Sequence, residues 1–401
     1  MIDGIYDVPL SHIVKNFTSM KRWLRDELEN DLCQTLDSSG VMMVASTKKW
    51  CFRLLVLGWL VGLTVAVIHL SQPAEDPPLP SGWTDWRSIG MVRSIALSPG
   101  GVFAGGSRGL FQLNEDGKAT QIDIPRTRWQ PSVSALKYTS HNTLWVGHDQ
   151  GLSIRTAAGW TSPDVPQTLP RWHVNAMAET RTGRMWIGTT GGAVSMPTIG
   201  PWDRDNLHWI TTQEGLLHDT VWAIMEDRQG GIWFGNHAAP AGGLSHLQGR
   251  RWQHWALQDG LPHSNITSLL AASDDSVWVG CGLFNKGGIA IFRRTTDTWR
   301  LVRRLSVADL AGPKVRSLYE DSRGWIWIGS EYHGLAIRGR DRRVVILTTD
   351  DGLPGMEIMD IVEAGDGVMW LGTSGGVVRI APQALEKLFA SVDGSRMEPS
   401  P

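Results

Sequence analysis

Blocks of alternating apolar and polar residues recur along the chain, and the clearest block runs from Val315 to Arg338. It predicts a strand, a turn at Asp321–Gly324, a second strand containing Trp327-Ile-Gly329, and a third strand. The second strand recurs every 41 to 49 residues, as Trp145-Val-Gly147, Trp186-Ile-Gly188, Trp233-Phe-Gly235, Trp278-Val-Gly280 and Trp370-Leu-Gly372, with a degenerate copy at Phe103-Ala-Gly105. One block cannot bury its own apolar faces, whereas seven side by side can. The period therefore predicts an all-β, seven-bladed β-propeller of four-stranded antiparallel blades, with the repeated tryptophans in the core.

A lone strand-like stretch, Trp83-Thr-Asp-Trp86, precedes the first full repeat and resembles the fourth strand Trp252-Gln-His-Trp255. The last repeat has only three strands. We therefore predict that the stretch at 83–88 completes the last blade, so that the propeller covers 83–381 and leaves no open edge there. A short helix at 383–389 is expected in the C-terminal segment 382–401. The first strands of the blades are expected to begin at Val92, Val133, Val174, Val221, Ile266, Val315 and Ile358.

The segment before the propeller predicts two helices and a tether. Residues 1–49 contain apolar positions at a helical period from Ile13 to Leu36. They predict an amphipathic helix over 13–36 that lies against a partner, its own copy or a membrane surface. Residues 71–82 are rich in proline and predict a stiff, extended tether.

Residues 50–70 are almost uninterruptedly apolar, with one charge near their start, Arg53. At 1.5 Å per residue they span roughly 31 Å, which matches a bilayer core. Lys48 and Lys49 precede the span and acidic residues follow it, so the N-terminus is expected in the cytoplasm and the propeller outside. We interpret the span as a transmembrane signal anchor; a cleaved signal peptide is the alternative. Gly58 and Gly62 have the spacing of a helix-dimerisation motif and would support a homodimer.

Composition narrows the range of functions. The net charge is −2 and no basic run accompanies the aromatic residues, which argues against nucleic-acid binding. The three cysteines, at 33, 51 and 281, share no metal-like spacing and predict no disulfide framework. Walker, Gly-x-Ser-x-Gly and His-Glu-x-x-His motifs are absent. We therefore expect no catalytic residues, no cofactor and no metal site.

Candidate binding residues gather on one face of the predicted ring. Loops that join fourth to first strands and second to third strands share that face, and three blades have extra residues there, at 237–241, 281–286 and 331–333. These loops predict a surface for a protein partner, a small ligand or a glycan; a role of the histidines as metal ligands or bases, or no role at all, remains open. The candidates on this face are Trp129, His148, Arg171, Trp172, His218, His237, His263, Phe284, Glu331, Tyr332 and His333. Of these, His218 and His263 each stand three residues before a first strand, so we expect them to be neighbours at the channel rim.

The repeat resembles the two-component regulator propeller repeat. The matching pieces are Glu320-Asp321, Gly324, Trp327-Ile-Gly329, Gly334-Leu335 and the Asp-Gly-Leu-Pro loops at 259–262 and 351–354. The resemblance covers about 83–380 and implies a bacterial periplasmic sensing propeller. In that family, two propellers often precede a transmembrane helix and a histidine kinase or diguanylate cyclase, whereas here one propeller follows the apolar span.

Three functions remain in competition. The first is a sensor-type module in the bacterial inner membrane, crossing it once, whose periplasmic or extracellular propeller binds a ligand or protein without catalysis. The second is a propeller lyase or hydrolase that uses rim histidines and acidic residues. The third is a scaffold subunit of a membrane complex, held together by the N-terminal helix and the span.

Overall fold

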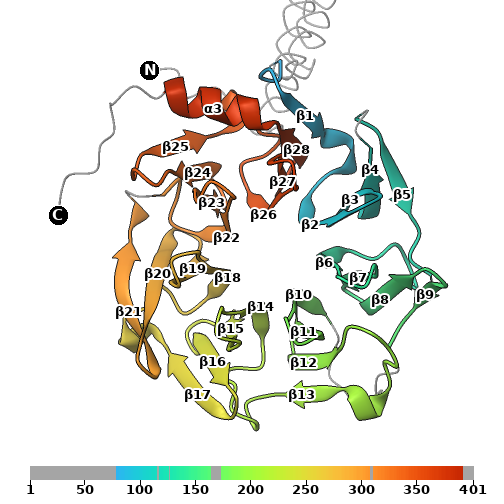
Figure 1. The fold of residues 1–401 in the computed structure, drawn as a ribbon, viewed down its shortest axis with the longest axis vertical. Helices are drawn as coiled ribbons and strands as arrows, with labels where there is room; N and C mark the ends of the chain where they lie inside the picture. Colours follow the sequence, from blue (N-terminus) through green and yellow to red (C-terminus); the bar gives the residue numbers. More distant parts are fainter. Residues whose placement is uncertain (1–77, 115–116, 126, 164–172, 308–309, 392–401) are drawn as a thin grey trace, which may run out of the picture. The chain divides into compact units, whose positions relative to one another are not determined.

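Seven four-stranded antiparallel sheets surround a central axis in the computed structural model (Figure 1). The structure describes residues 78–391 except 115–116, 126, 164–172 and 308–309. The predicted all-β, seven-bladed propeller is confirmed. The helix predicted over 13–36, the span 50–70 with its glycines, and most of the tether lie outside the described residues. Within the described ranges, no helix combines the length and apolar character needed to cross a membrane.

The innermost strand of every blade begins at the predicted residue. Six of these residues are valine or isoleucine at 0% exposure and the seventh, Val92, is 1% exposed, because the preceding blade packs on them. Blades are numbered 1 to 7 in the order of their inner strands, which are β2 (Val92–Ser98), β6 (Val133–Tyr138), β10 (Val174–Glu179), β14 (Val221–Glu226), β18 (Ile266–Ala271), β22 (Val315–Glu320) and β26 (Ile358–Glu363).

The glycine of each Trp-x-Gly repeat is the contact point between blades. A Cβ placed on Gly147 would lie 2.3 Å from Cγ1 of Val174, the first residue of the following blade. The equivalent distance from Gly105 to Val133 is also 2.3 Å, so only glycine lets neighbouring blades approach this closely. The second strands that carry this glycine are β3 (Gly101–Gly106), β7 (Leu144–His148), β11 (Arg184–Thr189), β15 (Ile232–Asn236), β19 (Val277–Leu283), β23 (Ile326–Ser330) and β27 (Met369–Thr373).

Five of the six repeat tryptophans are buried, as predicted. Trp233 and Trp327 are fully buried, and their Nε1 groups donate to Asp227 (2.9 Å) and Asp321 (3.0 Å). The same carboxylates accept backbone N–H groups of the turns that precede the strands. Trp186 is the exception, because it is only half-buried and lies edge-on against Phe234 of the next blade, with ring centroids 5.3 Å apart. The prediction of a core position is wrong for this residue.

The third strands lie between the second strands and the outer strands of the blades, and one of them corrects a prediction. Residues 281–286 were expected to form an inserted loop, yet Cys281 is a buried strand residue and only Phe284 and Asn285 form the turn. The two strands simply continue as a longer hairpin. The third strands are β4 (Gly109–Leu113), β8 (Gly151–Thr156), β12 (Gly192–Pro197), β16 (Leu244–Gln248), β20 (Lys286–Thr295), β24 (Leu335–Arg338) and β28 (Gly376–Ile380).

The fourth strands form the outer edges of the blades. Six of them are three to five residues long, whereas β21 has eight. They are β5 (Ala119–Ile122), β9 (Gly159–Thr161), β13 (His208–Ile210), β17 (Arg251–Trp255), β21 (Thr298–Leu305), β25 (Val344–Leu347) and, from the beginning of the propeller, β1 (Trp83–Trp86). Short 3₁₀ turns and one helix complete the described chain: η1 (Arg87–Ile89), η2 (Arg204–Asn206), η3 (Leu257–Asp259), η5 (Thr349–Asp351) and α3 (Pro382–Ser391).

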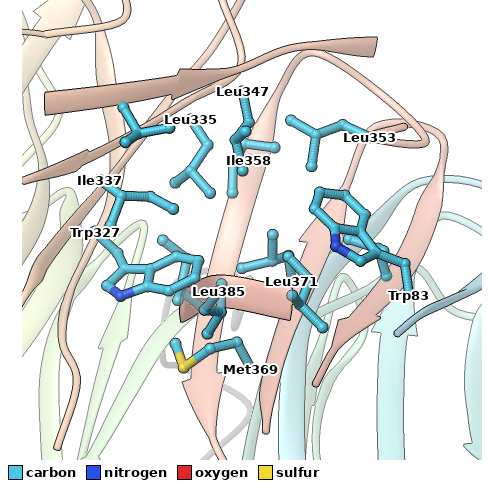
Figure 2. Packing of buried hydrophobic residues seen from close by; sticks show 14 of the residues in the cluster. Trp83, Trp327, Leu335, Ile337, Leu347, Leu353, Ile358, Met369, Leu371 and Leu385 are labelled. Atoms are coloured by element: carbon cyan, nitrogen blue, oxygen red, sulfur yellow. The ribbon is translucent and has the colours of Figure 1, made fainter. Parts of the chain in front are cut away.

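The ring closes through β1, as predicted. β1 pairs with β28 from Trp83↔Ile380 to Trp86↔Val377, so the last blade takes three strands from one end of the propeller and one from the other. Trp86 stacks on Trp370 of that blade with ring centroids 5.1 Å apart. Trp83 belongs to the cluster of buried residues between the last two blades, which Leu385 of α3 also joins (Figure 2).

Candidate functional site

A bulge at the second residue of every inner strand shapes the mouth of the channel. In all seven blades the pairing between first and second strands shifts at this point. Side chains of the preceding blade hydrogen-bond to the carbonyl of the first residue: Asn175 Nδ2 donates to Val221 O (3.0 Å), and Ser317 Oγ donates to Ile358 O (2.8 Å). The bulges thereby hold neighbouring strands in place just below the loop-rich face.

Two ion pairs stand beside these bulges in blades 6 and 7. Arg316 Nε contacts Glu357 Oε1 at 2.7 Å, and Lys314 is paired with Glu331. All four side chains are less than a fifth exposed. Burial opposes ionisation of Glu331, but the hydrogen bonds from Lys314 and Tyr332 and the charges of Lys314 and Arg316 together outweigh it and lower the pKa of its carboxyl. For Glu357, burial outweighs the attraction of Arg316 and raises the pKa. The pairs therefore carry charge in a poorly hydrated place, where an approaching charged group interacts strongly.

Two histidines adjoin the ion pairs from blades 4 and 5. The ring of His237 lies 4.8 Å from that of Trp222, a residue on the inner strand β14. Burial, followed by Lys314 and Arg316, lowers the pKa of His237. Burial, Lys286 and Lys314 do the same for the pKa of His263. We call the set Trp222, His237, His263, Lys314, Arg316, Glu331 and Glu357 the rim cluster.

Two exposed aromatic side chains belong to the hairpins next to the rim cluster. Phe284 is 69% exposed and Tyr332 is 54% exposed. Phe284 occupies the turn between β19 and β20 with φ of +53°, in the left-handed region that glycine normally fills. The hydroxyl of Tyr332 bonds to the Glu331 carboxylate, which raises the pKa of the phenol. We call Phe284, Lys286, Lys314, Glu331 and Tyr332 the binding lobe.

The other predicted site residues are held elsewhere. Trp129 is 59% exposed in the loop before blade 2, and His333 is exposed beside Gly312. His218 accepts the Thr220 N–H on Nδ1 at 3.0 Å and thus supports a turn. The charges that act on His237 include His263, so these two histidines are neighbours; the arrangement expected for His218 and His263 stays a prediction. Arg171 and Trp172 lie outside the described residues.

His148 is a buried part of blade 2. Its Nδ1 accepts the Gln150 N–H (3.1 Å), so Nε2 carries the proton and donates to Ser153 Oγ (3.1 Å). Burial lowers the pKa of His148 to about 4. The neutral ring thus serves the packing of the hairpin, at an exposure of 3%.

This burial predicts a loss of stability in mild acid. The unfolded chain takes up the His148 proton near pH 6.5, but the folded protein does so only near pH 4. The stabilisation of the folded protein by the neutral His148 ring is complete above pH 6.5. It falls as the pH drops towards 4, by about 3 kcal/mol in total. Chemical denaturation at pH 7.5 and pH 4.5 should show a smaller pH dependence for His148→Gln than for the wild type. Equal pH dependence of the two proteins would contradict the prediction.

Lys314, Arg316 and Glu357 were missed in the sequence. Each stands one residue before or one residue after the first residue of an inner strand, and every repeat has these two positions. A comparison of these two positions between blades would have identified the charged residues. Most blades have small or uncharged residues there, whereas β22 has Lys314 before its first residue and Arg316 after it.

A separate hollow lies on blades 3 and 4. It has a volume of about 470 Å³ and is lined by Thr190, Trp209, Glu214 and Asp219 among others. Its carboxylates are occupied, because Glu214 accepts from Thr211 and Asp219 accepts the Thr212 N–H at 2.7 Å. We therefore place the candidate site at the rim cluster and binding lobe, where charge and exposed aromatic surface coincide. Among the described residues, no group of three or more histidine, cysteine or acidic side chains is arranged to hold a metal.

A family model described as two component regulator propeller matches residues 173–191, 215–238, 309–332 and 352–375, in blades 3, 4, 6 and 7. No curated protein sequence matches the chain.

Solved structures share the fold at low sequence identity. The extracellular domain of a hybrid two component system from B. thetaiotaomicron is 18% identical, with a TM-score of 0.65 over 77% of this chain and 42% of that chain. This chain thus spans less than half the length of that protein. Virginiamycin B lyase from Staphylococcus aureus is 12% identical, with a TM-score of 0.56 over 74% of this chain and 97% of the lyase. YCF48 bound to a D1 peptide is 10% identical, with a TM-score of 0.57 over 80% of this chain and 99% of YCF48.

Proposed function

This chain carries the two-component regulator propeller repeat, and from that premise we propose that it is a sensor-type recognition module without catalysis. The propeller binds a partner protein or ligand through the binding lobe and the rim cluster. Residues 50–70 anchor it in the bacterial inner membrane, with residues 1–49 in the cytoplasm and the propeller outside. Gly58 and Gly62 support a homodimer of the anchors. The similarity in fold to an extracellular domain of a two component system supports the placement of the propeller outside.

The observation that carries the proposal is Phe284. Its side chain is 69% exposed, so it contributes little to the core, and its backbone adopts a conformation that disfavours any side chain. Such strain costs of order 1 kcal/mol and persists mainly where function requires the residue. An exposed aromatic side chain beside charged side chains is typical of an interface anchor. A protein partner is therefore the first candidate for this lobe.

Replacing Phe284 by glycine separates function from folding. Glycine adopts a φ of +53° freely, so Phe284→Gly should unfold at the same or a higher denaturant concentration, with a gain of up to about 1 kcal/mol. Loss of an interface anchor should weaken partner binding by about 2 kcal/mol or more, roughly 30-fold. The measurement is quantitative capture from solubilised membranes by the full-length protein.

Ile199→Gly is the matched control. Ile199 is also exposed, at 59%, but it follows a third strand and so lies on the opposite face. It should leave capture unchanged. Equal capture by wild type and Phe284→Gly would remove the basis of the proposal.

A lyase activity is the second candidate. The fold is shared with virginiamycin B lyase, and the lowered pKa values of His237 and His263 keep both rings neutral and able to accept a proton near pH 7. Turnover of a candidate substrate that is lost with chelator and in His263→Ala and His218→Ala would favour this function over binding alone.

A further inference from the structure

We propose that the outer part of blade 5 binds an acidic segment of a partner polypeptide, which adds as a strand along the free edge of β21. This surface lies on the outermost strand of the blade, away from the channel mouth, and does not depend on the function proposed for the binding lobe. Figure 1 shows β21 at the periphery of the ring.

The register of β20 and β21 brings three arginines to one face. Arg293 and Arg300 are directly opposite each other in the pair, so they share a face. Residues three apart on a regular strand point to opposite faces. In this pair the register shifts after Leu301. Val302 has no partner on β20, and Arg303 lies opposite Ile291. Because Ile291 and Arg293 are two apart on β20, Arg303 joins Arg293 and Arg300 on that face.

The positive charge of this face is not balanced within the described residues. Arg293 is paired with the Asp274 carboxylate. Arg300 and Arg303 are both exposed, and neither side chain forms an ion pair or hydrogen bond with a described residue. Like charges directly opposite each other on a sheet destabilise it by a few tenths of a kcal/mol. Residues 293–304 hold five arginines and one acidic residue, Asp297, in a chain whose net charge is −2.

The edge itself fits a polypeptide better than another polyanion. β21 has eight residues and is the last strand of its sheet, so along one edge it pairs with no described strand. At the beginning of that edge the Trp299 N–H donates to Gln253 Oε1 of blade 4 at 3.3 Å, so an added strand would pair with the residues that follow Trp299. An added strand can pair with the backbone groups of such an edge. Val302, at 52% exposure, offers an apolar contact between the arginines. Charges on edge strands usually prevent pairing between copies. A run of a single sign repels a second β21 but attracts a strand that carries carboxylates.

The test uses the full-length protein and a fluorescein-labelled ten-residue peptide of alternating glutamate and valine. Fluorescence anisotropy should show binding that weakens as salt is raised, because the charges are exposed. The double variant Arg300→Gln/Arg303→Gln should bind the peptide about five- to tenfold more weakly. Arg250→Gln/Arg251→Gln removes the same charge from two exposed arginines of the blade 4 hairpin and should bind like the wild type.

Two further experiments identify the class of molecule that binds at the edge of β21. The same peptide, N-methylated at alternate backbone positions, should bind at least several-fold more weakly, because strand addition requires its N–H groups. Vesicles containing phosphatidylglycerol should not compete with the peptide. The proposal is overturned if both double variants lose the peptide equally, if the methylated peptide binds as well as the unmodified one, or if only the vesicles bind in a way that depends on Arg300 and Arg303.

Discussion

Gly147→Ala is expected to destabilise the propeller by about 3 kcal/mol, at the upper end of the usual cost of overpacking. The added Cβ would lie 2.3 Å from Cγ1 and 2.8 Å from Cβ of Val174. These atoms belong to the inner strand of the next blade, not to a flexible side-chain end. The two blades would therefore have to separate, and neighbouring hydrophobic contacts would weaken with them. Urea denaturation, followed by tryptophan fluorescence, measures the change.

Two comparisons isolate the contact between blades. Gly100→Ala is the control, because an added Cβ there meets nothing within 4 Å and the glycine has no positive φ. Its stability should stay within about 0.5 kcal/mol of the wild type. Val174→Ala makes room, so the double variant should be less destabilised than the sum of the single variants. If Gly147→Ala behaved like Gly100→Ala, the packing account of the repeat would be wrong.

Trp86→Ala should open the closure of the ring, at a cost of about 3–5 kcal/mol. Trp86 is 2% exposed, stacks on Trp370, and donates from Nε1 to Lys118 O of the first blade at 3.3 Å. Its loss loosens β1 on β28 and on blade 1 together. Deleting residues 81–90 removes the strand altogether and should have the larger effect.

Limited proteolysis locates the damage. Both changes should increase cleavage between residues 360 and 380, in the blade that β1 completes. Trp160→Ala is the control, because this tryptophan belongs to the outer strand of blade 2 and takes no part in closure. Cleavage near 360–380 that is no faster than in the wild type would show that β1 does not hold the last blade.

The architecture was predictable from the sequence because each repeated residue takes part in the same packing contact in every blade. At Gly147 and Val174, for example, one blade has no side chain where the next blade presents a β-branched one. That contact recurs in all blades, so the residues that form it repeat along the sequence. The orphan strand at Trp83 was predictable for a related reason, since the last repeat lacked one strand.

The candidate site was less predictable, because its residues are what the repeats do not share. Glu331 and His237 were found through their loops. Arg316 and Glu357, from blades 6 and 7, form an ion pair although they are 41 residues apart, and no single repeat contains both. His148 is a residue that was wrongly predicted to be available for binding. Its position next to a loop suggested exposure, whereas its ring is buried.

Hairpin length and strand burial also limited the prediction. Extra residues between two strands lengthen either the loop or the strands, and spacing does not distinguish these outcomes. At 281–286 the strands are longer, which buries Cys281, raises the pKa of its thiol to about 12, and carries Phe284 outward at the tip. Trp186 is half-buried because its ring packs across to Phe234 and Ile232 of the adjacent blade at the side of the sheet.

The most direct test of the recognition function is site-specific photo-crosslinking in living cells. A photoreactive phenylalanine analogue is introduced at position 284 of the full-length protein and, in parallel, at position 199 on the opposite face. The account predicts a discrete, light-dependent adduct with an extracytoplasmic partner from position 284 and none from position 199. The same adducts from both positions, or none from position 284 in cells where the protein is folded and exported, would contradict it.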